Sequence, residues 1–457
     1  MHNLNTVLVF AAFISAAASA EQTSCIVGVT IIDVVDGSRA QERNVVIEGE
    51  RIASVTGAAL ATPDCTNLIE AEGKYLIPGL WDMHVHGTSR DSLWPIYIAN
   101  GVTGVRDMFG PSDFNALRQR LADAQIKPRV YMSGPLIDGP PGIWPGSTLV
   151  VNADDARRVV TEQAAAGVDF LKVYQLLSRD AYYAIIDEAS KRGLPVVGHV
   201  PSSVSAWEAA NAGQLSIEHL IDIAVSCSAD EDTIRQRPPE SYMDSRKEDA
   251  GAVSSFDSAK CGRLAQVFLR NGTWMVPTLI AFHAESHVDQ DKGLENERLQ
   301  YFNAEVRNWL EADQELMDAD VTALKAALRG DMGLVSFLYS EGVPFLAGTD
   351  ALNPYVFPGF SLHDELALLV ESGLTPLAAI QAATINAAKF LGTDGELGSV
   401  EPGKLADLLL LDANPLEDIQ NSTKIAGVFS NGHYFDKLAI EGLLASARRS
   451  AAGIAEH

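Results

Sequence analysis

Basic residues are scarce in this sequence. Its 457 residues include 34 Lys and Arg but 60 Asp and Glu, which gives a formal net charge of -26. A protein that binds nucleic acid needs a basic face to meet the phosphate backbone, and this chain concentrates basic residues nowhere. The composition therefore argues against nucleic acid as a partner, and acidity of this size favours solubility.

Long apolar runs are also missing beyond the N-terminus, so the sequence predicts no stable membrane span. Residues 1–20 contain no Asp, Glu, Lys or Arg and end in Ala18-Ser19-Ala20, which is typical of a secretory signal peptide with its cleavage site. An apolar first helix is the alternative, because the basic residue that usually opens such a signal is absent. We expect an exported protein, periplasmic or secreted.

Cysteines are few, and export would place all four in an oxidising compartment. Four cysteines allow three connectivities. They fall into two local pairs along the chain, so we favour Cys25 with Cys65 and Cys227 with Cys261.

Short β segments lie at both ends of the chain. Turn signals separate candidate strands at 26–34, 44–48, 51–55 and 68–70, and further strands follow at 406–411 and 427–429. We expect residues 21–76 and 401–440 to form one small composite β domain, a β-sandwich, followed by a C-terminal helix or tail at 441–457.

The middle of the chain, residues 77–400, alternates apolar runs with capped helices expected at 152–166, 178–192 and 375–391. The expected strands are 76–86, 102–107, 129–133, 170–174, 196–200, 216–220, 274–279 and 345–350. Eight such β/α units favour a (β/α)₈ TIM barrel, an α/β fold, over an open doubly wound sheet. Long insertions at 221–273 and 280–342 are expected to lie over the barrel mouth as lids.

His84-Val85-His86 is the first candidate metal site. Alternate side chains of a strand point the same way, so both imidazoles would project together, although two hydrogen-bonded core histidines would give the same pattern. In a barrel, the carboxyl ends of all strands meet at one mouth. The polar residues at these ends are His84, His86, Lys172, His199, His219 and Asp350. Burying them together without a metal ion would be very costly, so the sequence predicts a metal centre.

Several motifs resemble those of the amidohydrolase superfamily, in particular its imidazolonepropionase-like branch, which includes Xaa-Pro dipeptidase-like metal-dependent hydrolases. The matching segments are 78–86, 101–107, 171–174, 198–200, 216–219, 348–350 and 403–408. The resemblance covers nearly the whole chain.

The resemblance implies two divalent metal ions, with zinc expected. One ion would be bound by His84, His86 and Asp350 and the other by His199 and His219, and a carboxylated Lys172 would bridge them. A metal-bridging hydroxide would attack the amide C–N bond of a dipeptide (Xaa-Pro-like) or an N-acyl amino acid, and Asp350 would move the proton to the leaving amine. Members of the superfamily often associate, so a homo-oligomer stays open.

Other polar residues have weaker assignments. Tyr174 is a candidate catalytic residue that would bond the substrate carbonyl or the oxyanion, with a core tyrosine as the alternative. We expect Arg106 and Asp107 to form a structural ion pair, and Asp82 to orient a metal ligand. His283 and His287 indicate a lid surface more than a further metal site, and His363 is expected near a helix cap.

Two alternative functions stay open at this point. A lactonase, esterase, phosphotriesterase or cyclic-amide hydrolase could use the same metal centre, because a fold and its metal site do not fix the substrate. A catalytically silent metal-binding protein is the second alternative, and the presence of both Lys172 and Asp350 argues against it.

Overall fold

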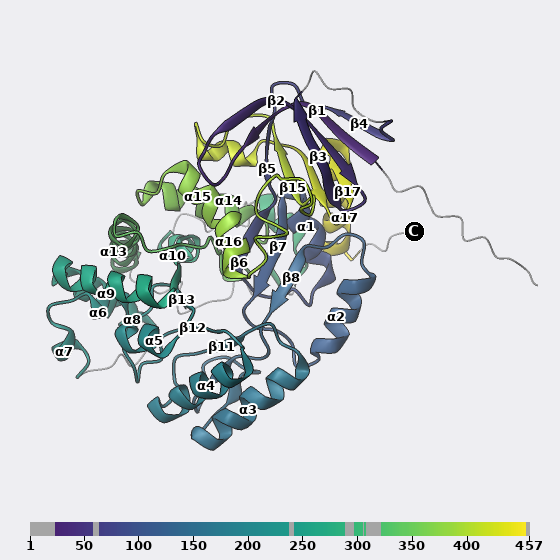
Figure 1. The fold of residues 1–457 in the computed structure, drawn as a ribbon. Helices are drawn as coiled ribbons and strands as arrows, with labels where there is room; N and C mark the ends of the chain where they lie inside the picture. Colours follow the sequence, from purple (N-terminus) through teal and green to yellow (C-terminus); the bar gives the residue numbers. More distant parts are fainter. Residues whose placement is uncertain are drawn as a thin grey trace, which may run out of the picture.

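The computed structural model describes residues 23–57, 64–236, 242–287, 297–304, 306–307 and 321–453. Figure 1 shows a sheet built from both ends of the chain, drawn in purple and yellow, next to a larger part in which strands are flanked by helices. The predicted signal peptide at 1–20 lies outside the described residues.

The two ends of the chain form one eight-stranded sheet. Its strands are β1 (Thr23–Ile32), β2 (Arg39–Glu48), β3 (Arg51–Gly57), β4 (Asn67–Glu70), β5 (Tyr75–Pro78), β15 (Leu408–Leu411), β16 (Ile425–Ser430) and β17 (His433–Asp436). They lie in the order β17-β16-β15-β5-β1-β2-β3, and β4 pairs with β1. The antiparallel pairing of β5 with β15 joins the two ends. Alternate apolar side chains from both ends fill one core, for example Ile26, Val45 and Phe429.

The larger part is an α/β fold with parallel strands. One sheet contains β6 (Leu80–Val85), β7 (Val102–Asp107) and β8 (Arg129–Met132). The other contains β9 (Ile137–Asp138), β10 (Thr148–Leu149), β11 (Leu171–Val173), β12 (Val196–Gly198), β13 (Ser216–Glu218) and β14 (Trp274–Val276). Isolated parallel bridges connect them at Ser133 and Phe170, at Met275 and Phe345, and at Val85 and Ala351. The parallel pairing therefore continues from β8 to β11 and, through residues 345–351, from β14 back to β6.

Two of the predicted strands need correction, and two short strands lacked a prediction. The run predicted at 76–86 is two strands in different sheets, β5 and β6, which meet at Gly79. A Cβ on Gly79 would lie 2.2 Å from the Thr103 hydroxyl oxygen, so only glycine allows this close crossing. The run at 345–350 forms isolated bridges at its ends in place of a strand ladder, and the short strands β9 and β10 were not predicted.

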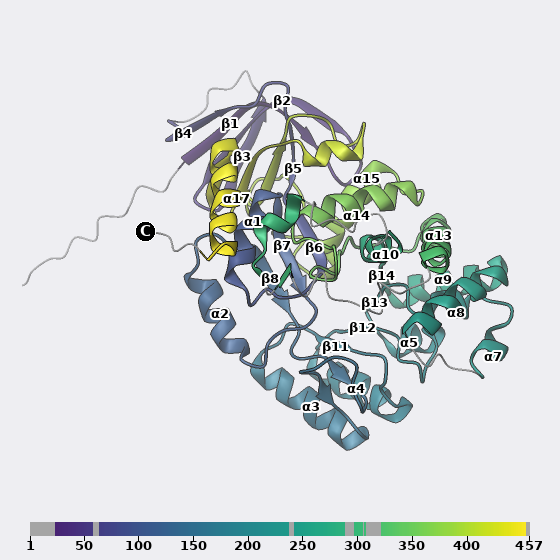
Figure 2. The same cartoon turned by 180° about the vertical axis from the view of Figure 1, so that it is seen from behind.

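Helices separate the strands and cover them. They are α1 (Trp94–Ala99), α2 (Phe114–Asp123), α3 (Ala153–Ala166), α4 (Arg179–Arg192), α5 (Ala206–Ala212), α6 (Ile223–Ser226), α7 (Glu231–Ile234), α8 (Tyr242–Ser254), α9 (Ser258–Asn271), α10 (Leu279–Ser286), α13 (Val321–Ser340), α14 (Phe360–Glu371), α15 (Pro376–Ala382), α16 (Ile385–Phe390) and α17 (Lys437–Ala451). Short 3₁₀ turns lie at η1 (Asp91–Leu93), η2 (Glu297–Tyr301) and η3 (Ile419–Thr423). In Figure 2, α17 lies beside α1, which it contacts. None of the described helices has the length and apolar character needed to cross a bilayer.

The predicted helix ends are confirmed for α3 and α4. The Asn152 side chain caps α3 and that of Ser178 caps α4, and a left-handed glycine ends each helix. The helix predicted at 375–391 is instead two helices, α15 and α16. The carbonyls of Ala382 and Ala383 accept hydrogen bonds from the N–H groups of Ala347 and Trp81, so they are held by neighbouring extended segments at the break.

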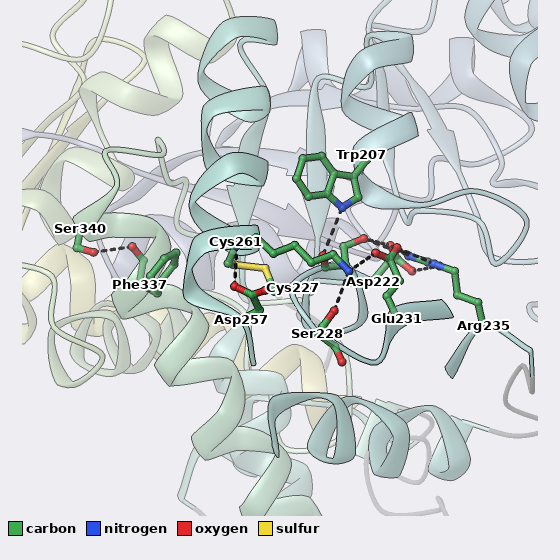
Figure 3. The surroundings of a disulfide bond; sticks show 12 residues. Trp207, Asp222, Cys227, Ser228, Glu231, Arg235, Asp257, Cys261, Phe337 and Ser340 are labelled. Carbon is green, nitrogen blue, oxygen red and sulfur yellow. Dashed lines mark hydrogen bonds and ion pairs between the residues drawn. A yellow bond between two sulfur atoms is a disulfide. The ribbon is translucent and has the colours of Figure 1, made fainter. Parts of the chain in front are cut away.

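Both predicted disulfides are confirmed. Cys25 is bonded to Cys65, and Cys227 to Cys261. Figure 3 shows that the second bond ties the end of α6 to α9 next to the cluster of Asp222, Glu231 and Arg235. This disulfide lies within the insertion at 221–273, whose helix α9 contacts α5.

Replacing Gly79 by alanine tests the crossing between the two sheets. The new Cβ has no room beside Thr103, so we expect overpacking to lower the free energy of unfolding by about 2 kcal/mol. Urea denaturation followed by circular dichroism measures this loss. Gly395→Ala is the matched control, because a Cβ at Gly395 meets nothing within 4 Å. Equal stability of the two variants would show that the crossing tolerates a side chain.

Candidate metal centre

One cavity of about 500 Å³ opens where the parallel strands end. The side chains that line it include every metal ligand predicted from the sequence and the candidate catalytic tyrosine: His84, His86, Lys172, Tyr174, His199, His219 and Asp350. These residues come from β6, β11, the ends of β12 and β13, and the segment that bridges back to β6. Val306, in the insertion 280–342, lines this cavity, whereas none of the described residues of the insertion 221–273 does.

His84, His86 and Asp350 lie closest together. The Nε2 atoms of His86 and His84 face the same carboxylate oxygen of Asp350, at 2.9 Å and 3.3 Å. The three potential ligand atoms all lie within 4.8 Å of one another. Within the described ranges, no other group of three His, Cys, Asp or Glu side chains has this spacing.

Lys172, His199 and His219 complete the arrangement. The His219 ring lies between the rings of His84 and His199. Its centroid is 4.7 Å from that of His84 and 4.9 Å from that of His199. Lys172 is buried, and burial lowers the pKa of its amine to about 8. Three neutral ring donors and an amine of reduced basicity thus surround one face of the cavity.

Burial favours the neutral form of three of these histidines, which is the form that binds a metal ion. Burial lowers the pKa of His84 and of His199 well below the usual range, and lowers that of His219 to about 3. The Nδ1 atom of His84 bonds to Glu218 at 2.8 Å and that of His219 to Thr278 at 2.7 Å. These outer bonds leave both Nε2 atoms for the centre.

Within the described part of the chain, two buried ring nitrogens have no hydrogen-bond partner: Nδ1 of His86 and Nδ1 of His199. Buried polar atoms are normally bonded, so such orphans beside a carboxylate and further imidazoles indicate an absent ligand. Imidazole nitrogen and carboxylate oxygen are the donors that zinc and similar divalent ions prefer. The residues therefore fit a metal site.

Asp350 is held in place through its backbone. Its neighbour Thr349 donates from both N–H and hydroxyl to the buried Asp82, at 2.9 Å and 2.7 Å, and Asp82 also accepts from the His84 N–H. Asp82 thus orients the backbone on both sides of the centre and, through the His84 N–H, the predicted ligand His84, in agreement with the sequence prediction. Burial would raise the pKa of the Asp350 carboxyl, but the facing histidines and Lys172 hold it below its usual value.

Arg106 pairs with Glu218, and the predicted ion pair with Asp107 is wrong. The Arg106 guanidinium donates to both carboxylate oxygens of Glu218 at 2.9 Å, and all of these atoms are buried. Asp107 points the other way and accepts from Thr88. Neighbouring residues of a strand face opposite sides, so Arg106 and Asp107 could not meet. Sequence reasoning did not single out Glu218. The available signal was an acidic residue within a strand that was predicted to be buried.

Tyr174 lies in the cavity, where its ring packs 3.9 Å from that of His199. Its hydroxyl oxygen accepts a hydrogen bond of 2.8 Å from the Trp144 indole N–H. Burial raises the pKa of Tyr174, so the phenol stays protonated. Sequence reasoning found Tyr174 but missed Trp144, which comes from the loop before β10.

The remaining histidine candidates lie elsewhere. His283 and His287 stack on each other at 4.1 Å, and the His287 Nδ1–H donates to the His283 carbonyl at 2.9 Å. No third metal-binding side chain joins them among the described residues. His363 lies near the start of α14, as predicted, and its buried ring bonds the Ser422 hydroxyl and the Asn100 carbonyl, so it provides no helix cap itself.

A family profile described as "Amidohydrolase family" matches residues 75–434, most of the chain. The chain belongs to the amidohydrolase family. This amidohydrolase is 24% identical to an ochratoxinase from Aspergillus niger over 428 residues, which cover 79% of this chain and 75% of the relative. A bottromycin amidohydrolase structure aligns with a TM-score of 0.72 at 25% identity, covering 94% of this chain and 90% of that one. A Xaa-Pro dipeptidase structure with bound methionine aligns at 0.66 and 20% identity, covering 91% and 100%.

The buried pair of Glu218 with Arg106 yields a prediction for stability. Glu218→Gln leaves the Arg106 charge buried without its counter-ion, so we expect the free energy of unfolding to fall by about 3 kcal/mol. Urea denaturation measures the change. Glu162→Gln is the control, because Glu162 pairs with Arg158 on the surface and should change stability by less than about 0.5 kcal/mol. A loss as small as that of the control would contradict a structural role for the buried pair.

Proposed function

We propose that this amidohydrolase cleaves the amide C–N bond of a dipeptide (Xaa-Pro-like) or of an N-acyl amino acid. The observation that carries the proposal is the convergence of four histidines, Lys172, Asp350 and Tyr174 on a single cavity. Its volume of about 500 Å³ lies within the range of small-molecule sites and gives room for a short peptide.

We also propose that residues 77–400 form a closed (β/α)₈ barrel, and that the sheet made from both ends folds into a small β-sandwich. The bridges that return the parallel pairing to β6 support the barrel, and the shared apolar core supports the sandwich. A barrel explains why residues far apart in sequence meet in one cavity, since all its strands end at the same face.

Two divalent metal ions, with zinc expected, fit the proposed centre. His84, His86 and Asp350 would hold one ion and His199 and His219 the other, and Lys172 would hold both once carboxylated. Bound there, the ions would polarise the scissile carbonyl and lower the pKa of a water molecule. Carboxylation adds carbon dioxide to the neutral lysine amine with loss of one proton. It gives two anionic oxygens where an ammonium would repel a cation.

The protein's own groups supply the proton transfers. Asp350 is anionic and faces the cavity, so it can take a proton from the attacking water and pass it to the leaving amine. Tyr174 is protonated and can donate a hydrogen bond to the carbonyl oxygen as negative charge develops. Arg90 and Asn353 line the same cavity, and the Arg90 guanidinium suits the free carboxylate of an amino-acid product.

A substrate screen with metal analysis tests the function. We expect about two metal ions per chain and turnover of Xaa-Pro dipeptides or N-acyl amino acids, and Asp350→Asn should lower kcat at least about 10³-fold because proton transfer is lost. The surface variant Asp187→Asn serves as the control. Esters, lactones and phosphotriesters are run in parallel. Turnover of these alone, with no amide cleaved, would refute the proposal, as would a fully active Asp350→Asn variant.

Lys172→Ala tests the carboxylated lysine. We expect activity and the second metal ion to be lost, because the cavity then lacks an anionic group between the two ion sites. Added acetate or propionate should restore part of both, since a small carboxylate can occupy the vacated space. Lys191→Ala, which removes an exposed amine from α4, should need no rescue. A Lys172→Ala variant that is active without added carboxylate would exclude the bridging role.

A further inference from the structure

Trp144 reaches from a surface loop into contact with the proposed catalytic residue. Its side chain is 40% exposed and lines the cavity, while its indole N–H donates to the Tyr174 hydroxyl oxygen at 2.8 Å. The indole N–H could bond to water at this exposed position, yet it is directed at the phenol of a residue that lines the cavity. The contact therefore needs an explanation beyond packing.

The loop that carries Trp144 is held in one conformation. The buried carboxylate of Asp138 accepts from the N–H groups of Gly139 and Ile143 in the loop, and from the N–H of Leu176, two residues beyond Tyr174. A Cβ on Gly139 would lie 1.9 Å from the Leu176 carbonyl oxygen, so the two segments are in close contact. Asp138 thus fastens the Trp144 loop to the segment that follows Tyr174.

The hydrogen bond from Trp144 determines whether the Tyr174 hydroxyl can still act as a donor. An indole nitrogen only donates, so the Tyr174 oxygen must be the acceptor. A phenol has a single proton, and no described protein group accepts it from Tyr174. Since Tyr174 lines the cavity, that proton remains available to an oxygen atom bound there.

We propose that Trp144 is a positioning residue that orients the Tyr174 hydroxyl so that its proton is donated to the carbonyl oxygen of the substrate. This inference rests on the proposed function. Without the indole N–H, the phenol can rotate or turn a lone pair toward the substrate, and the donor is lost for part of the time. Trp144 acts only through Tyr174, so its removal should affect the chemical step more than substrate binding.

Trp144→Phe removes the N–H and keeps an aromatic ring. We expect kcat to fall about tenfold with KM changed less than about twofold, whereas Tyr174→Phe should lower kcat by about 10²-fold or more. Trp207→Phe is the matched control, because the Trp207 indole also donates to an oxygen, the Ser226 carbonyl at 3.3 Å, yet does not line the cavity. Figure 3 places it beside the Cys227 disulfide. It should leave kcat unchanged.

The double variant Trp144→Phe, Tyr174→Phe decides whether the two residues act together. If Trp144 acts through Tyr174, its substitution should cost no further kcat once Tyr174 is phenylalanine. A tenfold loss in both backgrounds, or no loss in the parent background, would overturn the proposal.

A readout without substrate checks the contact itself. In ¹H–¹⁵N spectra, the indole resonance that disappears in Trp144→Phe should shift in Tyr174→Phe, while that of Trp207 should not. An unshifted Trp144 signal would overturn the inference. If the parent enzyme cleaves only esters or lactones, the proposed function fails, and the kinetic comparison is then made on that substrate and still decides the role of Trp144. A parent without turnover on any substrate would overturn both.

Discussion

The candidate metal centre depends on a buried chain of hydrogen bonds that runs from Arg106 through Glu218 to His84. Arg106 and Glu218 are fully buried, and the carboxylate accepts from the guanidinium and from the imidazole at once. A buried charge of either sign alone would be costly, so each group is tolerable only because the other is present. The same carboxylate fixes the His84 tautomer, because Nδ1 must carry the proton that it donates. Glu218 therefore has two roles: it neutralises the buried charge of Arg106, and it fixes the His84 tautomer that leaves Nε2 available to a metal ion.

Backbone strain is concentrated where the functional side chains leave their strands. His219, Thr278 and Asp350 have φ values of 60°, 52° and 63°, in the left-handed region that side chains other than glycine seldom adopt. Each costs of order 1 kcal/mol or more, which the surrounding packing must offset. The consequence is visible at Glu218 and His219: because the chain turns after the last strand residue, two consecutive side chains both reach the interior. Regular alternation would have placed them on opposite faces.

Features that depend on neighbouring residues in the sequence could be predicted, whereas contacts between distant residues could not. Local signals were sufficient for the ends of α3 and α4, since Asn152 and Gly167 act on their immediate neighbours. The family-like motifs were sufficient to select the four histidines, Lys172, Tyr174 and Asp350 among the side chains that line the cavity. The pairing of Arg106 with Glu218 and the contact of Trp144 with Tyr174 join residues that are distant in sequence, and no local pattern specifies them. The split at Gly79 depends on Thr103, a residue of the neighbouring strand, so the apolar run from Leu76 looked continuous.

Asp407 connects the sheet built from both ends to the parallel strands that carry the cavity. Its buried carboxylate accepts from Arg129 at the start of β8 at 2.6 Å, and its carbonyl accepts from the Gly79 N–H just before β6. The sheet is thus anchored at the amino ends of parallel strands, while the proposed metal ligands lie at or near their carboxyl ends. Contacts at the first end can set the stability and spacing of the strands without touching the reacting atoms. The loops at the carboxyl ends, including the Trp144 loop, are not needed for these stabilising contacts. Their sequences can therefore change to suit a substrate without loss of the fold.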